Sequence, residues 1–250
     1  MRNFLVLAFL FAAGGTVGWG LEVIYRRFFS QKHWVNPGYL TGPCLPLYGM
    51  SLCVLYVLSS SESYIPVNYP LLRKIILFLL MALAITMIEF VVGIVGLKIT
   101  KVRLWDYTNH KGNIYGVVCP LYSFYWSILS AIYYFLVDPY ISNALEKLIE
   151  GQILPFCLGL YYGIFMVDLA YSASLMAKIR KFAHESRIVI RLEELREDIY
   201  NAVKEYGKPS FLLSLRPGVP LRETLERYRD KYINSDIIME KLNLNIKKGK

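Results

Sequence analysis

The sequence predicts an all-α fold: a polytopic membrane bundle of about five transmembrane helices, with an internal parallel repeat and a helical cytoplasmic C-terminal tail. Three observations predict it. The 250 residues are 55% hydrophobic and only 19% are charged, compared with about 25% in an ordinary soluble domain. The apolar residues gather into stretches close to the ~20 residues that a bilayer-crossing helix needs. A polar loop motif occurs twice between these stretches.

Five stretches are expected to cross the membrane. In the first, Ala12-Ala13-Gly14 loosely resembles a cleavage site, but the apolar run continues to Ile24 and only Arg2 precedes it as a basic residue. We therefore expect a retained helix and no cleaved signal peptide. The second stretch is the shortest and opens with two prolines. The predicted spans are 4–29, 43–59, 71–97, 114–137 and 152–177.

The repeated loop motif divides the first four spans into two halves, about 4–59 and 71–137. Each copy begins with Trp, continues with Asn and Gly, and closes on a Cys that is followed at once or one residue later by Pro-Leu-Tyr. Each copy also follows a span that holds one acid, Glu22 or Glu89. Because two spans separate the copies, the repeat is parallel. Such pairs often place a binding site where the halves meet.

The basic residues predict the orientation in the cell membrane. The heavier set follows the first, third and fifth spans: Arg26, Arg27, Lys32, Lys98, Lys101, Arg103, Lys111, Lys178, Arg180 and Lys181. The positive-inside rule then places the N-terminus outside, and both loops and the C-terminus in the cytoplasm. The net charge of +9 fits contact with the lipid bilayer and its anionic headgroups, and no nucleic-acid partner is expected.

The composition changes after residue 177, so we divide the chain into a transmembrane domain (1–177) and a cytoplasmic tail (178–250). In the tail, apolar residues recur at helical spacing from Ile188 to Val203. Gly207-Lys208-Pro209-Ser210 breaks this helix, and a second amphipathic helix carries Leu221, Leu225, Tyr228 and Tyr232. We expect a helical hairpin that lies on the membrane or docks a partner. The sequence contains no Gly-x-x-x-x-Gly-Lys-Ser/Thr phosphate loop.

Three acids inside the predicted spans are the first candidates for a site. A charge at that depth costs at least ~2.5–3.5 kcal/mol on insertion scales, so such residues usually face a cavity or a partner. Glu22 has Arg26 four residues later, which permits an ordinary ion pair within the helix. Glu89 and Asp168 have no base at helical spacing and must be protonated, paired across helices or capped by tyrosines. A cation site, a proton relay or a hydrogen bond to a polar ligand all remain open.

The two loops are the second candidate, because their glycines allow close backbone approach and their Asn, Trp, Asp and Tyr side chains can bind a polar ligand. The alternative for the tryptophans is the aromatic belt at the headgroups. For the Pro-Leu-Tyr turns it is helix initiation. The candidate ligand-binding residues are Glu22, Trp34, Asn36, Gly38, Gly42, Cys44, Tyr48, Glu89, Trp105, Asp106, Tyr107, Asn113, Gly116, Cys119, Tyr122 and Asp168.

Metal and catalytic patterns are weak. The four cysteines form no Cys-x-x-Cys pair, and His33 and His110 stand singly in the loops, so no metal site is predicted. No catalytic triad is visible, and the sequence identifies no cofactor. Cys119 near Asp106 and His110 keeps an intramembrane enzyme as a third alternative.

The motifs together resemble a bacterial membrane family labelled ABC-transporter type IV permease, or CmpB-like, over about 18–134. They are Gly18-Trp19-x-x-Glu22, the run from Asn36 to Gly49, Glu89, and Trp105-Asp106-Tyr107 with Asn113, Gly116 and Cys119. In that family a basic residue often follows the Asn of the first loop and the Gly of the second. Pro37 and Val117 stand there in this chain, so an anion that relatives bind there would be lost or changed.

The resemblance implies a permease-like component that binds or moves a small polar molecule or ion between the two halves. A separate ATPase or other cytoplasmic partner would then act through residues 178–250. The alternative is a non-transporting membrane subunit or sensor that works through this tail. A homo-oligomer is compatible with either hypothesis.

Overall fold

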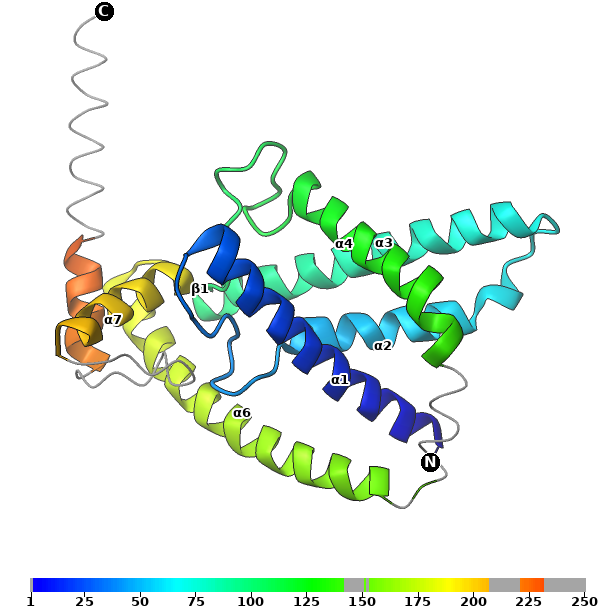
Figure 1. Ribbon diagram of the computed structural model, residues 1–250. Coiled ribbons are helices and arrows are strands. Elements are labelled where there is room, and N and C mark those ends of the chain that lie inside the picture. The colour runs from blue at the N-terminus through cyan, green and yellow to red at the C-terminus, as the bar shows by residue number, and fades with distance from the viewer. Residues whose placement is uncertain (1, 142–150, 152, 207–220, 232–250) are drawn as a thin grey trace, which may run out of the picture.

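The computed structural model describes residues 2–141, 151, 153–206 and 221–231, and most of these are helical (Figure 1). Within them, four helices are long and apolar enough to cross a membrane: Arg2–Ser30, Pro70–Thr100, Pro120–Ile141 and Ile153–Ser186. The predicted helical membrane class is therefore confirmed. The predicted span 43–59 forms the shorter helix α2 (Pro46–Ser60) of 15 residues, so the count of five spans stays a prediction.

The membrane helices end and begin in related ways. Helices α1 (Arg2–Tyr25) and α3 (Pro70–Val95) each continue into one π-helical turn, Arg26–Ser30 and Gly96–Thr100. Helices α2, α3 and α4 (Pro120–Ile132) each start with proline. Proline suits a first turn because its missing N–H would have no partner there. Helix α4 continues through a π-helical segment, Tyr133–Val137, to residue 141.

Two predicted boundaries differ from the structure. The fourth helix begins at Pro120 and not at residue 114, because Tyr115 and Gly116 have φ values of +54° and +67°, which a helix does not allow. Helix α6 (Ile153–Ser186) continues past residue 177. The basic residues of this extension are good helix formers. Ile179 and Ala183 are buried where the extension packs against the tail.

The helices of the membrane part form a layered bundle in which α2 contacts both α1 and α3, and α3 contacts α4. A core of large side chains fills the space between α2, α3 and α4. It consists of Leu55, Leu77, Met81, Ile85, Trp126, Tyr133 and Tyr134. Helix α6 lies along α1 at the side of this bundle (Figure 1). Both loops lie toward the end of the molecule that carries the tail.

The tail forms a second core against the end of α6. Strand β2 (Ile190–Arg191) and α7 (Leu192–Tyr206) follow α6, and a helix at 221–231 completes the cluster. Its buried residues include Ile179, Ile188, Leu192, Leu195, Ile199, Leu225 and Tyr228. Strand β1 (Val102–Arg103) pairs in parallel with β2. The predicted breaker 207–210 and Tyr232 lie outside the described residues, and the proposed domain boundary at 177 stays a prediction.

Candidate functional site

The first loop, residues 31–45, is held together by the side chain of Asn36. Its Nδ2 donates to the carbonyl oxygens of Leu40 at 3.2 Å and Thr41 at 2.7 Å. Its Oδ1 accepts from the Trp19 indole at 2.8 Å and from the Gly38 N–H at 3.4 Å. Asn36 is 1% exposed. Its hydrogen-bonding capacity is therefore used inside the protein, and its first role is to shape the loop.

The second loop, residues 104–119, is held in the same manner by Asn113. Nδ2 donates to the carbonyls of Thr108 at 3.1 Å and His110 at 2.9 Å, and Oδ1 accepts from the Gly116 N–H at 3.0 Å. Gly116 adopts a left-handed φ of +67°, which favours glycine. The Trp105 indole donates to the Val117 carbonyl at 2.8 Å. Trp105 therefore belongs to the loop's own framework.

Glu89 lies on α3 and is 1% exposed. The Tyr107 hydroxyl donates to its Oε1 at 3.1 Å. Its Oε2 accepts no hydrogen bond of regular geometry from any residue that the structure describes, and the Trp126 indole is a further donor near the carboxyl group. Burial, followed by the Glu89 carboxylate, raises the pKa of Tyr107, so this phenol stays protonated and remains a donor.

Glu22 lies on α1 and accepts two hydrogen bonds. Arg26 Nε donates at 3.0 Å, so the predicted contact four residues apart is present. The Tyr48 hydroxyl donates to the other oxygen at 3.3 Å. Tyr48 reaches Glu22 because Gly18 leaves room, since a Cβ at Gly18 would collide with the Tyr48 ring.

Four aromatic side chains lie near Glu22 and Glu89 and are called the aromatic cluster here: Tyr48, Tyr107, Tyr122 and Trp126. The rings of Tyr48 and Trp126 are 4.8 Å apart, and those of Tyr107 and Tyr122 stack at 4.2 Å. Tyr48 and Tyr107 each lie within electrostatic range of both acids. The structure thus brings together an acid from each predicted half, with phenol hydroxyls between them.

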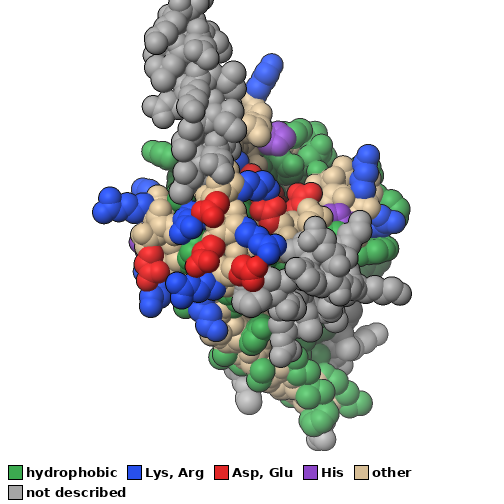
Figure 2. Space-filling model, turned by 90° about the vertical axis from the view of Figure 1, so that its left-hand side faces the viewer, with side chains coloured by type: hydrophobic (Ala, Val, Ile, Leu, Met, Phe, Trp, Pro, Cys, Tyr) green, Lys and Arg blue, Asp and Glu red, His purple; other side chains and the backbone are tan. Residues whose placement is uncertain are grey.

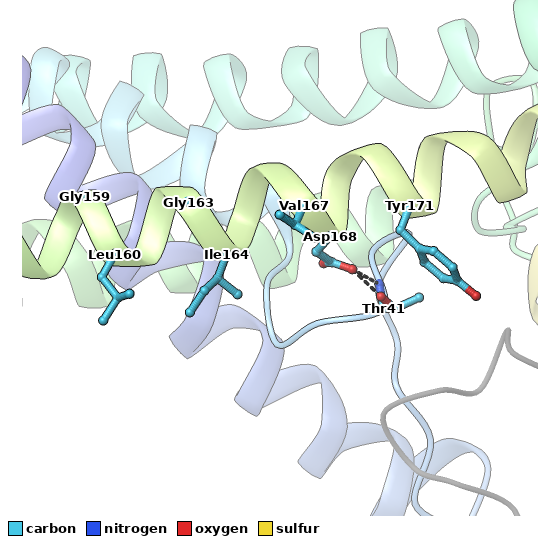
Figure 3. Close-up of a pocket in the computed structure, with 8 residues that line it drawn as sticks. All are labelled: Thr41, Gly159, Leu160, Gly163, Ile164, Val167, Asp168 and Tyr171. Atoms are coloured by element: carbon cyan, nitrogen blue, oxygen red, sulfur yellow. Dashed lines mark hydrogen bonds between the residues drawn. The ribbon is translucent and has the colours of Figure 1, made fainter.

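Asp168 lies elsewhere and holds the first loop against α6 (Figure 3). Its carboxylate accepts from the Thr41 N–H at 3.2 Å, the Thr41 hydroxyl, the Gly42 N–H at 3.0 Å and the Ser172 hydroxyl at 3.4 Å. Four donors account for a carboxylate at this depth without any ligand. The adjoining hollow of ≈ 640 Å³ runs along α6 between Gly159 and Tyr171 and is mainly apolar.

The remaining predicted residues are spread over the loops. Trp34 is half exposed beneath the Arg27 guanidinium. Cys44 is buried against Gly15, and burial raises the pKa of its thiol. Cys119 is buried at the start of α4. No described contact joins Cys119 to Asp106 or His110, and no cluster of three metal-ligating side chains occurs among the described residues.

Sequence reasoning missed that the tail touches both loops. Arg196 of α7 is 3% exposed and donates to the carbonyl of Pro37 at 2.7 Å and to that of Gly38. Burial, followed by the charge of Arg26, lowers the pKa of Arg196. The sequence does contain a sign of this contact, because Arg196 shares a face of α7 with the apolar residues Leu192 and Ile199.

Two ion pairs reinforce this docking. Arg26, which already holds Glu22, also contacts Glu193 of α7 at 2.7 Å. Arg191 contacts Asp106 of the second loop at 3.0 Å, and Arg103 contacts the same carboxylate at 3.0 Å. Figure 2 shows side chains of both charges gathered at this end of the molecule. The segment 190–196 is therefore linked to both loops.

The family model described as "Putative ABC-transporter type IV" (ABC_trans_CmpB) matches residues 9–173. The chain belongs to this family. The resemblance inferred from the motifs is confirmed, and membership together with the apolar helices fits a multi-pass, transport-related membrane protein. No curated protein and no solved structure matches the chain. The matched residues of this ABC-transporter-type chain include both loops and all three membrane acids, and they end before the docked tail.

Proposed function

We propose that this chain is a permease-like membrane component that binds a small polar molecule or ion between two repeated halves. The convergence of Glu22 and Glu89 on one aromatic cluster carries this proposal. Buried acids inside membranes are expensive and usually serve a substrate or ion pathway. Glu89 keeps one carboxylate oxygen without a regular partner in the described region, so it has capacity for a ligand.

The repeat is part of this proposal, and several local correspondences support it. In each half a helix with one acid ends in a π-helical turn. A lysine with left-handed φ follows, Lys32 at +58° and Lys101 at +55°. A loop held by one Asn comes next, and a helix that starts with proline closes the half. An ancestral duplication of about 4–59 and 71–137 accounts for all of these features.

We further propose that the loops and the tail face the cytoplasm, as the basic residues predict. The chain has no phosphate loop of its own, and an ABC-transporter-type family suggests that a separate ATPase supplies energy. The tail is the suitable contact for such a partner, because it bonds to both loops. A homo-oligomer remains a prediction.

The second candidate is a non-transporting sensor or subunit that works through its tail. The bonds of Arg196 and Arg191 to separate loops favour it, because they give the tail access to events at both. Removal of residues 187–250 would then abolish function, whereas Asn113→Ala would have a mild effect. A transporter whose site lies at the aromatic cluster would instead lose ligand binding when the cluster is altered.

The test compares Glu89→Gln with Glu62→Gln in purified full-length protein. Glu62 is a matched control, because it also accepts a tyrosine hydroxyl, that of Tyr134 at 2.7 Å, but at the other end of the bundle. A panel of inorganic cations, amines and amino acids is screened for an increase in thermal midpoint. We expect Glu89→Gln alone to lose the increase. An unchanged increase in Glu89→Gln would place the ligand elsewhere and reject the proposal.

A further inference from the structure

We propose that Glu89 is a proton-binding site: its carboxyl group holds a proton on Oε2 in the arrangement seen here and releases it when the second loop moves away. This inference deepens the proposed function, on which its role in transport rests, by naming the proton as an ion that the site binds. The occupancy of the site by a proton is a separate property of the chain and can be measured without any transported substrate.

The surroundings of Glu89 supply too little to hold a buried negative charge. The groups that act on its carboxyl are Trp126 and Tyr107, and no Lys or Arg of the described residues is among them. Among the described residues, Tyr107 gives the Glu89 carboxyl its only hydrogen bond of regular geometry. A buried carboxylate without a cation and with few donors is neutralised by protonation in preference to remaining charged.

The two other membrane acids provide an internal comparison. Asp168 accepts four hydrogen bonds, two of them from backbone N–H groups. Glu22 is paired with the Arg26 guanidinium at 3.0 Å and is partly exposed. Each of these carboxylates therefore has the hydrogen-bond donors or the cation that stabilise its negative charge. Glu89 is the exception among the three, although it is the least exposed of them.

The position of Glu89 suits reversible exchange with water on the side of the loops. Thr100 ends its helix 11 residues later, which corresponds to roughly 16 Å. Tyr107 spans part of that distance, since its hydroxyl contacts Glu89 while its backbone lies in the second loop. Its ring stacks on Tyr122, and the ring of His110 packs edge-on against both. Movement of the second loop would therefore withdraw Tyr107 and open Glu89 to water.

Other titratable groups near this path are accounted for. Tyr48 and Tyr122 belong to the aromatic cluster, and Glu22 accepts a hydrogen bond from Tyr48 and has its charge balanced by Arg26. The proton is taken from water and returned to water, so only the Oε2–H bond forms and breaks. No oxidant, reductant or leaving group is involved.

Infrared spectroscopy of the full-length protein in lipid nanodiscs tests the proposal. We expect a carbonyl band of a protonated carboxylic acid at neutral pH that shifts in D₂O. It should vanish in Glu89→Gln and persist in Glu62→Gln. Tyr107→Phe should move the band to higher frequency, because Tyr107 donates to Oε1, the carbonyl oxygen of the protonated group.

Each outcome separates the two proposals. No protonated-acid band in the parent, or a band that neither Glu89→Gln nor Tyr107→Phe changes, overturns the proton site. If Glu89→Gln does not fold, the shift in Tyr107→Phe decides alone. Loss of ligand stabilisation in Glu89→Gln without such a band would leave the permease proposal standing. If the band is present and Glu89→Gln keeps its ligand stabilisation, the proton site stands and the permease proposal is rejected.

Discussion

The Arg196 guanidinium donates a 2.7 Å hydrogen bond to the carbonyl oxygen of Pro37, across 159 residues of sequence. A second bond reaches Gly38. We expect Arg196→Met to loosen the first loop, because two buried carbonyls lose their donor, at a cost of about 1–3 kcal/mol. Hydrogen exchange of residues 36–42 measures the change. Arg222→Met is the control: Arg222 is 88% exposed and pairs with Glu226, and such pairs contribute little. Equal exchange in both variants would contradict the docking.

Gly18 sets the position of Tyr48 beneath Glu22. We expect Gly18→Ala to lower stability by about 1–3 kcal/mol, because the added methyl group forces the Tyr48 ring to move. Gly20 lies on the same helix, and nothing lies within 4 Å of a Cβ placed there. Gly20→Ala should therefore be neutral or slightly stabilising. The thermal midpoints of the two variants in one detergent measure this difference, and a Gly18→Ala midpoint at or above that of Gly20→Ala would rule it out.

Asp168 should act as the anchor of the first loop on α6. Asp168→Asn loses a charged acceptor of four hydrogen bonds, so we expect a loss of about 1.5–3 kcal/mol for the strongest of them. Ser172→Ala removes a 3.4 Å contact to the same carboxylate and a 3.2 Å hydrogen bond from the Thr41 N–H, which keeps Asp168 as an acceptor. It should therefore cost less. Protease sensitivity of the first loop provides the measurement. Resistance equal to that of the parent would show that Asp168 is not the anchor.

The ion pair between Arg191 and Asp106 joins the tail to the second loop at 3.0 Å. Arg191→Glu should raise hydrogen exchange in residues 104–119, since it places two like charges together. The added change Asp106→Arg should restore part of the protection, although Asp106 also binds Arg103. Because Arg191 is 42% exposed, the effect should be modest and should shrink at high salt. A double variant no better protected than Arg191→Glu would argue against direct pairing.

The helical membrane class and the acids could be predicted because hydropathy and isolated charges are local properties of a sequence. Glu22 and Arg26 are four residues apart, and helix geometry alone predicts their contact. The donor of Glu89 was foreseen only as a class, a tyrosine. Which tyrosine serves depends on how the second loop folds back over α3.

The loop residues show what a sequence motif does not distinguish. Asn36 and Asn113 are predicted to bind a ligand, and the structure shows that both bond through their amides to backbone groups of their own loops. In a sequence motif, a polar residue that binds a ligand cannot be distinguished from one that stabilises its own loop. The contact of Arg196 with Pro37 was missed because it joins distant segments, and a basic residue on an amphipathic helix usually faces solvent. The short β1–β2 pair carries no periodic signal that a sequence could reveal.

Val102 is fully buried in the same cluster as Ile190 and Leu195, and the Ile190 N–H donates to the carbonyl of Lys101 at 3.0 Å. One wall of the tail's interior is thus supplied by the membrane portion. Residues 178–250 produced as a separate fragment would expose apolar surface and an open strand edge that the intact protein covers. In affinity capture, such a fragment would bind proteins non-specifically through this exposed apolar surface. Partner searches therefore require the whole chain in a bilayer mimetic.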